Sequence, residues 1–133
     1  MDWSECIEEK IVKEAKADKN LALSLKEIAK IKIKSADSLS EEFFISKISL
    51  LYDALREILE AIAIQKGFKI YNHECYAAFL KEILKMPDEA NIFDNLRKTR
   101  NAINYYGRKL DKEESLEIIK KIKQLIEKLK DLA

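Results

Sequence analysis

The chain has 133 residues, of which 37% are charged and 47% hydrophobic, and its formal net charge is +1. This length fits one domain, residues 1–133, that can bury a core without a disulfide framework or a structural metal. Only two glycines and one proline occur, which argues against a turn-rich sheet protein and favours long helices. We therefore predict an all-α domain without β-strands.

The sequence also indicates a compartment. It holds no apolar run of the roughly 18 residues that a membrane-spanning helix needs, and its acidic N-terminus lacks the layout of a signal peptide. Cys6 and Cys75 lie far apart and form no C-x-x-C pair, so neither a zinc site nor a disulfide framework is expected. We predict a soluble, cytoplasmic protein with reduced thiols and no membrane contact.

Ser4 is suited to open the first helix, because its hydroxyl can cap free amides and acidic side chains follow in the first turns. Apolar positions then recur at helical spacing as far as about Lys34. Residues 18–20 read Asp-Lys-Asn, and Asp and Asn side chains compete with the helical backbone. We predict one helix from Ser4 to about Lys34 with a break or kink at this point.

Ser38 and Glu41 have the spacing of a capping box, in which two side chains satisfy free amides at a helix start. We predict that a second helix begins there and ends at Gly67, because glycine tolerates the left-handed backbone that often follows a helix. Its apolar face repeats in steps of three and four residues, at Phe44, Ile48, Leu51, Leu55, Ile58 and Ile62.

A shorter helix is predicted over residues 72–85, with Asn72 as its cap. Pro87 closes it, because proline cannot donate the next helical hydrogen bond. A further helix is predicted over residues 89–106, with Gly107 as its C-terminal cap.

Asp111 is placed to open the last helix. Its apolar positions repeat for barely two heptads, at Ile118, Ile122, Leu125, Leu129 and Leu132. This repeat is too short for an independent coiled coil, so we expect the helix to form one wall of a bundle. Short connections favour antiparallel neighbours. The prediction is an antiparallel up-and-down bundle of four principal helices with one additional short helix.

Positive charge and aromatic rings gather between Leu96 and Leu110, where Tyr105 and Tyr106 are adjacent. Residues 91–133 hold eleven basic against seven acidic side chains. This surface suits an anion, although it falls short of the dense basic footprint of a duplex-binding protein. Arg100, Asn101, Asn104 and Tyr105 project from neighbouring positions of one helix. The candidate ligand-binding residues are Arg97, Arg100, Asn101, Asn104, Tyr105 and Arg108.

Arg100 has two interpretations at this stage. Its guanidinium can hold a phosphate while a tyrosine ring stacks on a base, a combination that suits nucleotides and single-stranded RNA. Alternatively, Arg100 braces its own bundle or a dimer, with Tyr105 half-buried beside it.

Three segments, in this order and at this spacing, resemble the HEPN superfamily of helical nucleotide-binding domains, in particular its small stand-alone archaeal and bacterial members. The segments are the helix LYDALREILEAIAIQKG at residues 51–67, then His73 followed by Phe79, and then Arg100-x-x-x-Asn104-Tyr105 ahead of a long last helix. The resemblance runs from about Ile48 to the C-terminus. It implies structural roles for Tyr52, Gly67, His73 and Phe79.

The functional signature of that superfamily is an arginine followed four to six residues later by a histidine, often with asparagine directly after the arginine. Arg100 and Asn101 match its start, but Tyr105 stands where the histidine is expected. The only histidine, His73, aligns with a different position, where we expect a capping or packing role. Metal-independent RNA cleavage needs a group that titrates near neutrality, which tyrosine does not supply.

The resemblance therefore implies a non-catalytic module that binds a nucleotide, single-stranded RNA or a partner nucleotidyltransferase, as in toxin–antitoxin pairs. The alternative is a metal-independent, toxin-like endoribonuclease that uses Arg100 with Asn104 and Tyr105 in place of the usual histidine.

The motifs of nucleotide hydrolysis, zinc proteolysis and serine hydrolase chemistry are absent, because the chain has no glycine-rich phosphate loop, no H-E-x-x-H and no G-x-S-x-G. Glu57 and Glu60 have no matching Glu-x-x-His pair, so a solvated acidic face is expected there rather than a metal site. The lysines of the last helix are likewise read as a solvent face. We expect no metal and no cofactor.

Association is expected from the same resemblance, since HEPN-like proteins commonly pair through their helices. Trp3, Phe43 and Phe44 add apolar surface beyond what one bundle obviously needs. We predict a homodimer with Arg100 near its interface.

Overall fold

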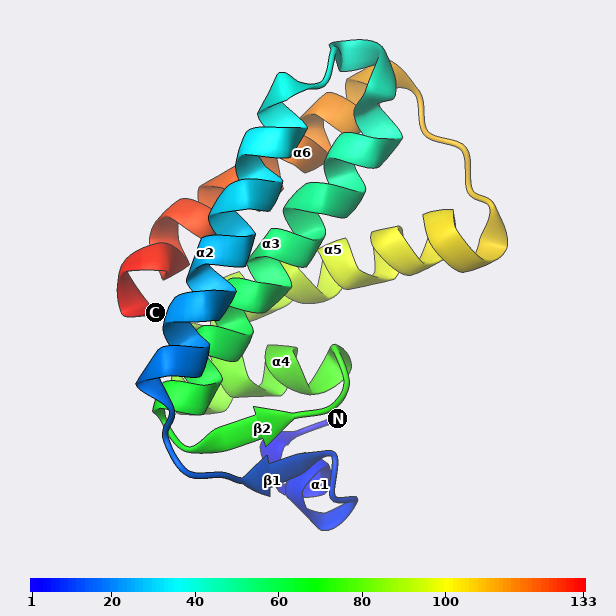
Figure 1. Ribbon diagram of the computed structural model, residues 1–133. Helices are drawn as coiled ribbons and strands as arrows, with labels where there is room; N and C mark the ends of the chain where they lie inside the picture. Colours follow the sequence, from blue (N-terminus) through cyan, green and yellow to red (C-terminus); the bar gives the residue numbers. More distant parts are fainter.

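The computed structural model describes all residues, 1–133, and four long helices dominate it (Figure 1). These are α2 (Lys19–Ser38), α3 (Phe44–Gln65), α5 (Pro87–Tyr106) and α6 (Lys112–Leu129). The short helical elements are α1 (Trp3–Glu8), α4 (Glu74–Ala78), the π-helical turn η2 (Phe79–Ile83) and the 3-10 turns η1 (Glu41–Phe43) and η3 (Lys130–Leu132). The predicted helical class is confirmed.

Helix α3 is the centre of the fold, because 12 of its 22 residues are buried. Helix α2 lies antiparallel beside it (Figure 1) and contributes mainly small buried side chains, among them Ala22, Ala29 and Ala36, which let the two helices approach closely. Helix α6 covers another side of α3, and α5 crosses behind α3 at a wide angle. The predicted up-and-down four-helix bundle is not confirmed, since α3 and α6 run in the same general direction in Figure 1.

A two-stranded sheet replaces part of the expected first helix. β1 (Val12–Glu14) pairs antiparallel with β2 (Phe68–Ile70), and Lys13 lies opposite Lys69. The expectation of a chain without strands is therefore wrong, as is the expectation of one helix from Ser4 to Lys34. The paired residues are 54 or more positions apart in sequence, so no local sequence pattern predicts the pairing.

The predicted break at residues 18–20 is in fact a helix start. The carboxylate of Asp18 accepts a hydrogen bond from the amide of Leu21 at 3.0 Å, which caps α2. The predicted capping box of Ser38 and Glu41 is wrong. Ser38 is the last residue of α2, and its hydroxyl donates to the Ser35 carbonyl at 2.7 Å.

Other helix ends agree with their sequence signals. Asn72 accepts a hydrogen bond from the amide of Cys75 at 2.9 Å, and Asp111 caps α6 in the same way. Pro87 occupies the first turn of α5, two residues before the predicted start. Gly107 follows α5 with a left-handed backbone at φ 64°. On α6 the predicted apolar face is slightly rotated, because Ile119 and Ile126 are buried and Leu132 is exposed.

Cys6 and Cys75 form a disulfide with Cα atoms 6.1 Å apart, so the prediction of two reduced thiols is wrong. The strand pairing explains it, because it carries α1 back against α4 (Figure 1). Trp3 is packed in the core against Phe68 and Phe79, with ring centroids 5.2 and 5.8 Å away. Trp3 is therefore not available for the predicted dimer surface.

None of the helices is both long and apolar enough to cross a membrane.

Candidate functional site

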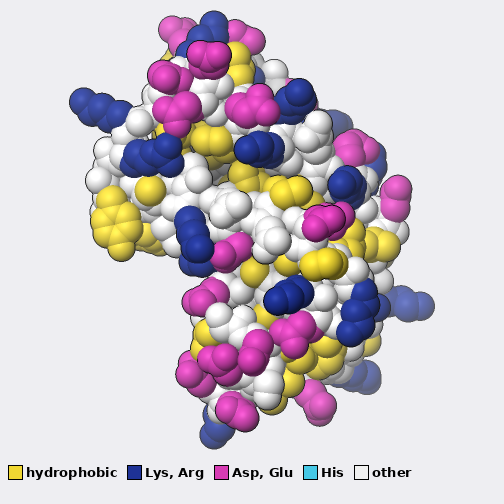
Figure 2. All heavy atoms as spheres, turned by 180° about the vertical axis from the view of Figure 1, so that it is seen from behind, with side chains coloured by type: hydrophobic (Ala, Val, Ile, Leu, Met, Phe, Trp, Pro, Cys, Tyr) yellow, Lys and Arg dark blue, Asp and Glu magenta, His cyan; other side chains and the backbone are white.

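The C-terminal half of α5 and the segment between β2 and α4 enclose a shallow pocket of about 380 Å³, here called the Arg100 pocket. Its lining residues are Tyr71, Asn72, His73, Glu74, Arg97, Arg100, Asn101 and Tyr105. Seen from behind, the molecule has a notch on the side where α5 lies above the N-terminal elements (Figure 2). Acidic side chains gather on the lower part of the molecule in that view.

Arg100 is the cation of this pocket that has no acidic partner. Its Cζ lies 5.5 Å from the ring centroid of Tyr52 and 5.9 Å from that of Tyr105. Arg97 is paired with Asp94 at 2.9 Å, and Arg108 is paired with Glu114 at 2.8 Å. The half-buried Arg100 guanidinium is thus held by two aromatic rings and keeps its hydrogen-bond donors free.

His73 joins the pocket to the core, because its Nδ1 atom lies 3.0 Å from the hydroxyl oxygen of Tyr52. Burial, together with the positive charges of Arg56 and Arg100, lowers the pKa of His73 to about 4. Burial raises the pKa of Tyr52 to about 12. Both groups are therefore neutral at pH 7 and act there as hydrogen-bonding groups, and His73 is not a proton donor near neutrality.

Glu74 is the one acidic residue of the lining, and its charge is balanced. Its Oε1 atom lies 3.2 Å from the N-terminal ammonium of Met1. The Glu74 carboxylate raises the pKa of that ammonium, mainly through the hydrogen bond and to a smaller extent through its negative charge. The pocket therefore keeps the positive charge of Arg100 without an opposing carboxylate.

The structure brings together four of the six residues that the sequence proposed as ligand-binding, namely Arg97, Arg100, Asn101 and Tyr105. Asn104 and Arg108 are exposed and lie outside the pocket lining. His73, which the sequence assigned to a structural role, lies in the pocket, whereas Tyr52 and Phe79 are buried in the core.

Sequence reasoning missed the opposite wall of the pocket, which is the run Tyr71, Asn72, His73 and Glu74. A polar and aromatic run directly after a short apolar strand is a signal for such a wall. Only the fold shows that this run faces α5.

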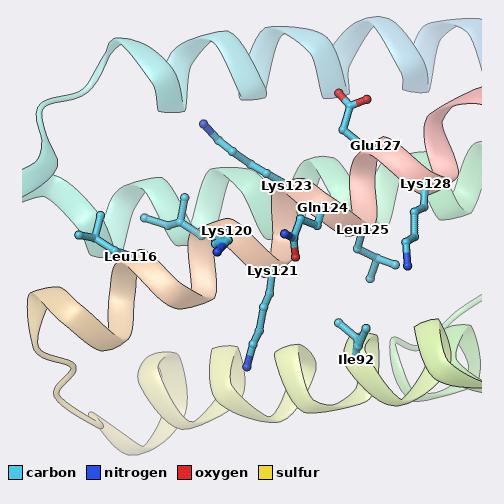
Figure 3. A pocket seen from close by; sticks show the side chains of 10 residues that line it. Ile92, Leu116, Lys120, Lys121, Lys123, Gln124, Leu125, Glu127 and Lys128 are labelled. Carbon is cyan, nitrogen blue, oxygen red and sulfur yellow. The ribbon is translucent and has the colours of Figure 1, made fainter.

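A larger pocket, about 740 Å³, lies elsewhere, in a groove between α5 and α6 (Figure 3). Figure 3 shows Leu125 and Ile92 facing each other and Lys121 reaching toward α5. Lys120 and Lys121 have no acidic partner within salt-bridge distance, whereas Lys123 pairs with Asp37 of α2 at 2.6 Å. The groove shares no lining residue with the Arg100 pocket and offers neither an arginine nor an aromatic ring.

Glu57 is not part of a solvated face, so that prediction is wrong. Its side chain is buried because α2 packs over this side of α3. Lys32 of α2 forms a salt bridge with its Oε1, while its Oε2 has no hydrogen-bond partner. Glu60 is half-buried and pairs with Arg56 at 3.1 Å.

No group of three or more His, Cys, Asp or Glu side chains is placed to hold a metal ion. Comparison of the chain with protein-family models, with curated proteins and with solved structures gives no match. The geometry of the pocket is therefore the basis for a functional conclusion.

Proposed function

We propose that this chain is a HEPN-like helical binding module whose Arg100 pocket takes a nucleotide or single-stranded RNA. The observation that carries the proposal is the free guanidinium of Arg100, which lies between the buried ring of Tyr52 and the exposed ring of Tyr105. Arginine presents a planar fork of donors that matches a phosphate. An exposed aromatic ring beside it offers a face on which a base can stack.

The neutral groups of the pocket fit the same ligand. Asn101 and His73 line the pocket beside Arg100. An amide and a neutral imidazole both donate and accept hydrogen bonds, so they suit base edges and sugar hydroxyls. Because the only lining carboxylate is balanced by the N-terminus, an anion meets little repulsion.

We propose a non-catalytic role, because the pKa of His73 near 4 leaves no imidazole that exchanges a proton near pH 7. One observation favours the alternative of a metal-independent ribonuclease. The fold places a histidine, His73, in the same pocket as Arg100, although it comes from a different segment from the one the superfamily signature uses.

The test is retention of labelled single-stranded RNA on purified protein, with an assay for cleavage in the presence of a chelator. The wild type is expected to retain RNA intact. Arg100→Ala is expected to weaken retention by about ten- to one-hundred-fold, because a charge-assisted phosphate contact is lost. Arg108→Ala is the matched control, since this arginine is exposed and paired outside the pocket.

The ring of Tyr105 is tested separately. Tyr105→Phe is expected to retain RNA and Tyr105→Ala to lose it, because stacking needs the ring and not the hydroxyl. Chelator-resistant cleavage by the wild type that disappears in both Arg100→Ala and His73→Ala would establish the ribonuclease instead. Equal retention by wild type and Arg100→Ala would reject this pocket as the binding site.

We also propose a protein partner, a small nucleotidyltransferase, because the proposed HEPN-like helical bundle implies one. The support is the order of the three sequence segments together with the helical class of the structure. A nucleotidyltransferase encoded in the adjoining reading frame that co-purifies with this chain is the expected result. An adjoining frame of another kind, with no co-purifying protein, would remove this part of the proposal.

We propose further that the module is a homodimer. Exposed apolar side chains remain on the outside of α2 and before α3, where Leu23 is 55%, Ile31 64% and Phe43 52% exposed. Light scattering at micromolar concentration is expected to give twice the chain mass of 15.5 kDa. A single-chain mass would contradict the dimer.

A further inference from the structure

We infer that the Arg100 pocket continues into a second subsite beside the two-stranded sheet, formed by Tyr71, Lys13 and Lys69, so that its ligand is a single-stranded nucleic acid of at least two nucleotides. This inference rests on the proposed function and narrows it, because a mononucleotide would leave the second subsite unused.

The pairing of β1 with β2 places the two lysines together. Lys13 of β1 and Lys69 of β2 are directly opposite in the antiparallel register, so their side chains project from the same face of the sheet. Their Nζ atoms lie 5.5 and 5.6 Å from the ring centroid of Tyr71. The three side chains therefore form one cluster, and all three are exposed.

This cluster is positively charged, and neither of its lysines has a salt-bridge partner. Like charges directly opposite each other on neighbouring strands repel and destabilise the pair. No acidic side chain forms a salt bridge with either lysine, although the chain contains 24 acidic residues. A bound anion would offset the repulsion, and a phosphate is the anion that the neighbouring pocket is proposed to take.

Tyr71 connects the cluster to the first subsite, because it is itself a lining residue of the Arg100 pocket. Its side chain is 57% exposed, and that of Tyr105 in the same pocket is 70% exposed. Two exposed rings thus border one pocket, with Arg100 beside one ring and a lysine pair beside the other. Alternating rings and cations are the pattern that binds successive bases and phosphates of a single strand.

Competition against a fluorescently labelled eight-nucleotide oligoadenylate RNA tests the inference, with unlabelled adenosine monophosphate and oligoadenylates of two, four and eight nucleotides as competitors. We expect the dinucleotide and longer strands to compete at least ten-fold better than the monophosphate. Lys13→Ala/Lys69→Ala is expected to weaken octamer binding by about ten-fold and leave monophosphate binding unchanged, because neither lysine lines the Arg100 pocket. Tyr71→Ala is also expected to weaken octamer binding by about ten-fold. Arg100→Ala is expected to weaken both.

Two matched variants control for nonspecific effects. Lys120→Ala/Lys121→Ala removes the same charge from the groove between α5 and α6, and Tyr106→Ala removes a tyrosine that is 84% exposed outside the pocket. Both are expected to bind the octamer like the wild type. All substituted side chains except the half-buried Arg100 are exposed, and an unchanged melting temperature confirms that each variant is folded.

Arg100-dependent binding of the monophosphate, with no gain from a longer strand and no effect of the Tyr71, Lys13 and Lys69 substitutions on octamer binding, would overturn this inference and leave the proposed function intact. Absence of Arg100-dependent binding for every competitor would overturn both. Loss of octamer binding in Lys120→Ala/Lys121→Ala would place the strand in the other groove and would also overturn the inference.

Discussion

The hydroxyl oxygen of Tyr52 lies 3.0 Å from Nδ1 of His73, and this contact links the buried centre of α3 to the wall of the Arg100 pocket. The ring of Tyr52 also lies against Phe93 of α5, with centroids 6.0 Å apart. Arg100 rests on the same tyrosine. One buried side chain therefore positions groups from two elements that form opposite walls of the pocket.

The burial of His73 predicts a pH-dependent stability. The pKa of His73 is about 4 in the folded chain and about 6.5 in the unfolded chain. Between these values the unfolded chain binds a proton that the folded chain does not, so the free energy of unfolding is expected to fall as the pH drops from about 6.5 to about 4.

Nuclear magnetic resonance titration measures the pKa of the His73 ring, which is easy to assign because His73 is the only histidine. Urea unfolding at several pH values measures the change in stability. His73→Gln does not titrate and is expected to lose this part of the pH dependence. A ring pKa of 6 or above would contradict the prediction.

The disulfide of Cys6 and Cys75 predicts sensitivity to reductant. It joins residues 69 positions apart and ties α1 to α4. Reduction, or Cys6→Ser/Cys75→Ser, is expected to lower the free energy of unfolding by about 2–4 kcal/mol, because the unfolded chain regains the freedom that the cross-link removes. Thermal unfolding with and without reductant measures the loss. If two thiols react with an alkylating reagent in non-reduced, denatured protein, the disulfide is not formed and the prediction is wrong.

Alanine substitutions at the two glycines are predicted to lower the free energy of unfolding by different amounts. Gly67 and Gly107 both have positive φ, at 86° and 64°, so alanine is strained at either position. In Gly107→Ala the added Cβ meets no neighbouring atom, and the variant is expected to lose about 1–2 kcal/mol of stability. Gly67→Ala is expected to cost more, because its Cβ would lie 3.2 Å from the carbonyl oxygen of Ala15. Urea unfolding compares them, and equal losses would contradict the argument.

The buried salt bridge of Lys32 and Glu57 predicts non-additive mutations. Lys32→Met leaves the Glu57 carboxylate buried, with Arg56 at 3.9 Å as its nearest remaining cation. We expect this variant to lose about 2–3 kcal/mol of stability, and Lys32→Met/Glu57→Leu to recover most of it, because removing both charges leaves none uncompensated. A double variant as unstable as the sum of the single variants would show that the two residues do not interact.

The sequence by itself determined the helical class and several helix ends from Gly67 onward. The cues there are local, because a capping side chain, a proline or a glycine acts within a few residues of itself, as at Asn72, Pro87 and Gly107. The periodic apolar face of α3 likewise identified the central helix. Half of the Arg100 pocket was visible for the same reason, since Arg97, Arg100, Asn101 and Tyr105 lie on one stretch of one helix.

The tertiary structure alone decided the rest. The pairing of β1 with β2, the disulfide of Cys6 and Cys75, and the burial of Glu57 under α2 all join segments at least 25 positions apart. No local pattern records which distant segment a strand, a thiol or a carboxylate will meet. For the same reason the second wall of the pocket could not be predicted. Tyr71 and His73 come to lie beside Arg100 only when the turn after β2 packs against α5.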